Sequence, residues 1–204
     1  MKRRAFLIGL PLGLSACAAQ SVWAPDDVVS RAIYRSEGPK HLTLYTMRNT
    51  QSGSGAHTAL LIDASQRVIF DPAGTWRQDI MPERNDVLFG ASPRMEQIYV
   101  SIHARVTYYV TGQRIDVSPQ VAEQALTLAL AAGPVPAANC TRVTSRLLRQ
   151  LPGFESIRQT WGPNTLAEDF GRLPGVTTTV YREDDDPDKA VATATFSDRL
   201  TAGQ

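Results

Sequence analysis

The sequence predicts an α+β domain, because strand-like segments fill its first half and helical segments fill its second half. Apolar runs broken by turn-forming residues extend to about residue 111, and helical periodicity replaces them after Ser118. The chain of 204 residues is long enough for one domain with a sizeable core. We expect an antiparallel sheet or small barrel that packs against helices.

Five segments have the alternating or continuous apolar character of strands. They are residues 41–47, 58–62, 68–70, 97–103 and 106–111. The segment between the third and the fourth, residues 72–95, is expected to be a loop with one helical turn.

Three helices are predicted after the strands. Ser118 and Pro119 supply an N-cap and a first-turn proline for the first, and a Gly-Pro pair ends it. Asn139 can cap the second, whose apolar residues recur at helical spacing. The third, shorter helix is expected to start near residue 164.

The N-terminus has the features of an export signal. Basic residues precede a short apolar run, which is too short to span a hydrocarbon core of roughly 30 Å. Residues 14–17, Leu-Ser-Ala-Cys, resemble the bacterial lipobox, which implies removal of the signal peptide 1–16 and acylation of Cys17 as a membrane anchor. An ordinary secretory signal, cleaved between residues 16 and 19, is the alternative.

The predicted location is the cell envelope. Arg3-Arg4 resembles the twin-arginine export signal, and Ala18 in place of an aspartate favours the outer membrane, facing the periplasm. Removal of residues 1–16 leaves 18 basic and 20 acidic side chains, a net charge of about −2 that argues against nucleic acid as a partner.

The mature chain divides into three parts. Residues 17–38 are expected to form a lipidated tether with a short helix at 26–34. Residues 39–181 form the domain. Residues 182–204 are acidic and polar, and we expect them to be a solvated, disordered extension.

Cys140 is the thiol that remains free once Cys17 is acylated, and it falls at the first position of the second predicted helix. Unpaired N–H groups and the helix dipole at such a position favour the thiolate, which is the nucleophile, and could stabilise an oxyanion beside Asn139. The alternative is that Cys140 is a small buried apolar residue. An oxidising compartment argues for a thiol that is shielded or used.

A nucleophilic cysteine needs a base, and the chain contains three histidines. His57 follows the flexible residues 53–55 and opens an apolar strand, so its ring is expected at the end of that strand. His41 follows a segment typical of a surface, and His103 is expected on a strand, half-buried or exposed. His57 is therefore the preferred base.

Asp71 is the candidate that would orient the imidazole of His57. If residues 63–65 form a three-residue hairpin loop, Ile62 lies opposite Gln66 and His57 lies opposite Asp71, with Cβ atoms about 5 Å apart. Asp71 could then hold the imidazole in the orientation that takes the thiol proton. The alternatives are a role for Asp71 in the turn at residues 71–74, and a longer loop that shifts the register.

These residues resemble a known superfamily. Segments 55–62 and 68–71 are similar to the histidine strand and the next strand of NlpC-type papain-fold hydrolases, and residues 139–141 are similar to their nucleophile region. Because the histidine strand precedes the cysteine helix, the order resembles the circularly permuted branch, which includes lecithin:retinol acyltransferase. The resemblance implies a permuted papain-like fold, with Cys140 as nucleophile, His57 as base and Asp71 as the third polar residue.

The sequence thus predicts an envelope lipoprotein that acts as a thiol hydrolase or acyltransferase on amide or ester bonds, either in peptidoglycan peptides or in lipid acyl groups. No cofactor is expected, and no histidine shows the spacing of a zinc ligand set. The rival hypothesis is a non-catalytic envelope binding module that keeps the same fold.

Overall fold

The computed structural model describes residues 19–74, 76, 80–186 and 188. Within these residues seven strands form one sheet in the order β4-β5-β3-β2-β1-β6-β7, and every pairing in it is antiparallel. The strands are β1 (His41–Asn49), β2 (Gly55–Asp63), β3 (Arg67–Phe70), β4 (Glu83–Arg84), β5 (Val87–Phe89), β6 (Tyr108–Asp116) and β7 (Thr177–Tyr181). The sheet is open, with β4 and β7 at its edges, so the expected alternative of a small barrel is not observed.

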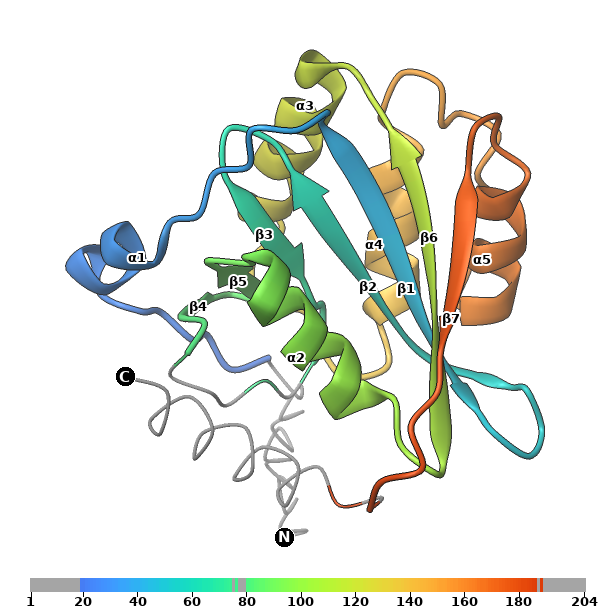
Figure 1. Ribbon diagram of the computed structural model, residues 1–204. Coiled ribbons are helices and arrows are strands. Elements are labelled where there is room, and N and C mark those ends of the chain that lie inside the picture. The colour runs from blue at the N-terminus through green and yellow to red at the C-terminus, as the bar shows by residue number, and fades with distance from the viewer. Residues whose placement is uncertain (1–18, 75, 77–79, 187, 189–204) are drawn as a thin grey trace, which may run out of the picture.

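Five helices accompany the sheet in the described part of the chain, which confirms the α+β class. They are α1 (Asp26–Ala32), α2 (Pro93–His103), α3 (Pro119–Leu130), α4 (Cys140–Leu148) and α5 (Pro163–Gly171). Figure 1 shows α2 on one side of the sheet and α3, α4 and α5 on the other. None of the described helices is long and apolar enough to cross a bilayer.

Two apolar cores result from the alternation of side chains along the central strands. Leu60 and Ile62 of β2 belong to the core shared with α3, α4 and α5, whereas Ala59 and Leu61 belong to the core shared with α2. The central strands β1, β2 and β3 are therefore buried on both faces, and neighbouring residues of β2 face different layers.

The prediction of a strand at residues 97–103 is wrong, because these residues form the last two turns of α2. The helix starts with Ser92, whose hydroxyl accepts a hydrogen bond from the backbone N–H of Met95 at 3.3 Å, followed by Pro93. All residues from Ile98 to His103 are buried. A segment that is buried on all sides loses the amphipathic period by which a helix is recognised. The Ser-Pro pair was the remaining helix signal.

The predicted register of the hairpin that joins β2 and β3 is wrong by two residues. Asp63 pairs with Arg67 and Ile62 with Val68, so the loop consists of residues 64–66. A shift of two residues preserves the face on which each side chain lies. The strand β3 ends at Phe70, opposite Leu60, and Asp71 follows directly.

The segments before and after the predicted domain are attached to it. The backbone N–H of Ala24 donates to the carbonyl of Glu83 at 2.9 Å. The backbone N–H of Val106 donates to the carbonyl of Asp185 at 3.2 Å. The predicted tether and tail therefore contact the domain at these points. Cys17 and residues 189–204 lie outside the described part.

Candidate active site

Cys140 lies where β3 ends and the edge of β2 is no longer paired. β3 pairs with β2 only at residues 60–63, so no described strand pairs with residues 55–59 on this side. The first turn of α4 packs there, because the hydroxyl oxygens of Thr58 and Thr141 lie 3.0 Å apart in a buried hydrogen bond. This contact fixes Cys140, the first residue of α4, beside the start of β2.

His57 and Asp71 form a close pair at the same place. The imidazole Nε2 of His57 donates to Oδ1 of Asp71 at 2.6 Å, and the Asp71 side chain is 2 % exposed. The pairing of β2 with β3 ends at Leu60 and Phe70, and the next residues in the same register would be Ala59 and Asp71. His57 lies two residues from Ala59, so it reaches the carboxylate as a diagonal neighbour on the same face. The structure thus brings the two residues together through a different register from the one predicted.

The thiol of Cys140 lies close enough to the His57 imidazole for each group to shift the pKa of the other. Because Asp71 occupies Nε2, the nitrogen left for the thiol is Nδ1. The three predicted site residues therefore form one chain of contacts, from Sγ of Cys140 through the imidazole to the buried carboxylate.

The charges in this chain favour an ion pair. Burial would lower the pKa of His57, but the charge and hydrogen bond of Asp71, together with Cys140, raise it to about 10. Burial would raise the pKa of the Cys140 thiol, but the hydrogen bond and charge of His57, with smaller effects of Thr141 and the Thr58 backbone, hold it below its usual value. The arrangement therefore favours the thiolate and the imidazolium over the neutral thiol and imidazole.

Two residues of α2, Tyr99 and His103, complete the surroundings of His57. The ring of His103 stacks on that of His57 with centroids 6.3 Å apart and lies 4.4 Å from the ring of Tyr99. Its Nδ1 donates to the carbonyl of Tyr99 at 2.7 Å. Burial is the largest single effect on Asp71 and opposes its ionisation. The charge and hydrogen bond of His57, with smaller effects of His103 and Tyr99, together outweigh burial, so the pKa of Asp71 lies below its usual value.

Tyr99 and His103 were missed as a pair because their segment was predicted to be a strand. In a strand, residues four apart lie about 13 Å from each other, whereas in a helix they are neighbours. The Ser-Pro signal at residues 92–93 would have placed both on one side of a helix.

The expected side-chain cap by Asn139 is wrong, although the helix starts where predicted. Its amide nitrogen donates to the carbonyl of Ala137 at 3.0 Å, and no side-chain cap forms. The backbone of Asn139 has φ −100° and ψ 4°, which is not the extended conformation of a typical N-cap residue. The side chain therefore leaves the first N–H groups of α4 uncovered.

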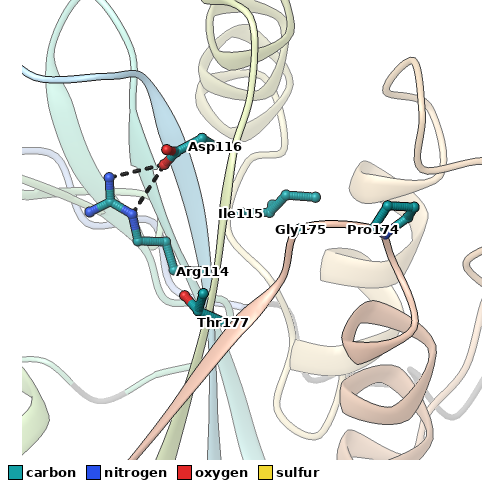
Figure 2. A pocket seen from close by; sticks show the side chains of 6 residues that line it. All are labelled: Arg114, Ile115, Asp116, Pro174, Gly175 and Thr177. Carbon is teal, nitrogen blue, oxygen red and sulfur yellow. Dashed lines mark hydrogen bonds and ion pairs between the residues drawn. The ribbon is translucent and has the colours of Figure 1, made fainter.

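His41, the third histidine, lies at the other end of the sheet. Its Nδ1 is 3.3 Å from a carboxylate oxygen of Asp63, its partner across β1 and β2. Asp63 is six residues from His57 along β2, or about 20 Å. An open pocket lies near this end too, between the end of β6 and the start of β7 (Figure 2). Neither feature includes Cys140.

The described residues contain no group of three or more histidine, cysteine, aspartate or glutamate side chains that could hold a metal ion. Comparison with protein-family models, with curated proteins and with solved structures gives no match.

Proposed function

We propose that this protein is a cysteine hydrolase or acyltransferase with a permuted papain-like fold. The observation that carries the proposal is the continuous contact from the Cys140 thiol through His57 to the buried Asp71 carboxylate. The chain order supports it as well, since the histidine strand precedes the cysteine helix, as in the permuted relatives of lecithin:retinol acyltransferase.

In the proposed reaction the Cys140 thiolate attacks the carbonyl carbon of an amide or ester. The imidazolium of His57 gives its Nδ1 proton to the leaving amine or alcohol as the tetrahedral intermediate collapses to a thioester. Water or another acceptor then attacks the thioester while His57 takes its proton. The Cys140 thiolate is released and the acyl group leaves with the acceptor.

Asp71 keeps the imidazole oriented through both steps and stabilises its charged form before the first step and after the second, because its carboxylate accepts from Nε2 at 2.6 Å. The negative oxygen of the intermediate would be stabilised by the uncovered N–H groups at the start of α4. The proposal assigns to this chain the cell envelope as location and Cys17 as lipid anchor, with peptidoglycan peptides or lipid acyl groups as substrates.

The test is turnover of two substrate classes. Full-length protein is incubated with muropeptides and, separately, with phospholipid vesicles, and released products are identified by mass spectrometry. Cys140→Ala should abolish turnover while circular dichroism stays unchanged. The mass of the mature protein tests acylation of Cys17 independently.

Alkylation of Cys140 at neutral pH separates this proposal from a non-catalytic binding module. A hydrolase should react rapidly without denaturant. Labelling that is slow and requires denaturant would contradict the enzyme and favour the binding module.

A further inference from the structure

Strained backbone gathers in the loops that carry the proposed site. Among the described residues, those other than glycine with positive φ are Ala73 (58°), Asn85 (44°), Asp86 (66°) and Ala138 (63°). Ala73 lies two residues after Asp71, and Ala138 two residues before Cys140. Side chains disfavour this conformation, so it persists only where the surroundings hold it in place.

Asp86, in the turn between β4 and β5, contacts both of these loops. Its carboxylate Oδ2 accepts a hydrogen bond from the backbone N–H of Val135 at 2.7 Å, in the loop that leads to Cys140. Its backbone carbonyl accepts from the N–H of Asp71 at 2.8 Å. The backbone of Ala73 lies close enough to the Asp86 carboxylate to lower its pKa.

We infer that Asp86 is a positioning residue, which clamps the loop that carries Asp71 to the loop that carries Cys140 and so sets the reactivity of the thiol. The inference rests on the proposed function. None of the contacts described for Asp86 involves the thiol itself, so it acts through the two loops.

The charged groups that face Asp86 make the clamp sensitive to pH. Burial raises the pKa of Asp86 to about 6, with the hydrogen bond of Val135 opposing the rise and the charge of Asp71 adding to it. The charge of His57 opposes the rise as well, and Glu83 accepts from the Asp86 backbone N–H at 3.3 Å. The carboxylate is therefore present at neutral pH and is lost as the pH falls through about 6.

Three variants of the full chain test the clamp by the rate of Cys140 alkylation with iodoacetamide. Asp86→Gly removes the carboxylate and adds no strain, because glycine adopts positive φ freely. We expect alkylation at pH 7 to be at least about tenfold slower, since a backbone N–H loses a charged partner. Asn85→Gly, in the same turn, is the matched control and should react like the wild type.

Asp86→Asn keeps an oxygen for the Val135 N–H but cannot titrate. It should restore the rate at pH 7 and reduce the fall in rate between pH 7 and 5, leaving only the part that protonation of the Cys140 thiolate causes. If Asp86→Gly does not fold, the pH profile of Asp86→Asn alone tests whether Asp86 is a clamp. A wild-type rate in Asp86→Gly, or an unchanged profile in Asp86→Asn, would overturn the clamp. A wild type that is itself unreactive would instead overturn the proposed function.

Discussion

The substitution Asp71→Asn tests most directly whether the buried carboxylate creates the reactive thiol. Asparagine keeps the shape and one oxygen acceptor but removes the charge that lies 2.6 Å from Nε2 of His57. The variant should therefore lose the ion pair between His57 and Cys140 without opening a cavity.

The structure gives the size of the effect. At 2.6 Å and an effective dielectric constant of about 20, the attraction between Asp71 and protonated His57 is about 6 kcal/mol. The rise in the pKa of His57 from 6.5 to about 10 corresponds to about 5 kcal/mol in favour of the imidazolium. Burial alone lowers this pKa, so His57 should be neutral at pH 7 once the charge of Asp71 is removed.

Without the imidazolium, the thiol of Cys140 loses the main interaction that lowers its pKa. A thiol with the ordinary pKa of 9.0 is only about 1 % ionised at pH 7. A more acidic thiol is intrinsically a weaker nucleophile, which offsets part of the gain from ionisation. We therefore expect Asp71→Asn to slow alkylation at pH 7 about tenfold, with the difference vanishing near pH 10.

The assay is the rate of iodoacetamide incorporation at Cys140 between pH 5 and 10, read by peptide mass spectrometry so that Cys17 is counted separately. Asp63→Asn is the matched control, because Asp63 is also buried and lies beside a histidine, at the other end of the sheet. It should leave the profile unchanged. Equal profiles for Asp71→Asn and the wild type would refute the role given to Asp71.

Three further predictions concern the packing and stability of the site. Gly74→Ala should slow alkylation as Asp71→Asn does, because a Cβ at this position would lie 2.1 Å from a carboxylate oxygen of Asp71. Thr141→Val should lower the free energy of unfolding by about 1–3 kcal/mol in urea titrations, because it leaves the buried hydroxyl of Thr58 without its partner. The double variant with Thr58→Val should recover much of this loss. The unfolding free energy should also fall above pH 7, as His57 loses its proton through pH 10, and below pH 4, as Asp71 gains one; a flat profile would show that the pair does not stabilise the fold.

The proximity of Cys140, His57 and Asp71 could be predicted because each follows a local signal. His57 lies near the start of an apolar strand, Asp71 follows the end of the next, and Cys140 begins a helix. The error in register did not change the predicted proximity of His57 and Asp71. An even shift keeps both residues on one face of the sheet, and diagonal neighbours remain within contact distance.

The supporting residues could not be predicted in the same way, because their roles depend on contacts between distant segments. Tyr99 and His103 reach the site only because the buried segment is helical. Asp86 lies 49 residues before Val135, whose N–H donates to its carboxylate, and no local sequence pattern predicts that contact. Asn139 marks the start of α4 correctly, yet the preceding loop turns its side chain away from the helix.

If Cys17 is acylated as proposed, the attachment of the N-terminal segment to β4 limits where the domain can work. Ser21 donates to the side chain of Asn85 at 2.8 Å, next to Asp86. Cys17 precedes Ser21 by four residue steps, which span at most about 14 Å. An acyl anchor at Cys17 would therefore hold the domain close to the membrane surface. It would confine the thiol to a thin layer next to the bilayer, where its encounters are set by the local concentration of substrate at that surface.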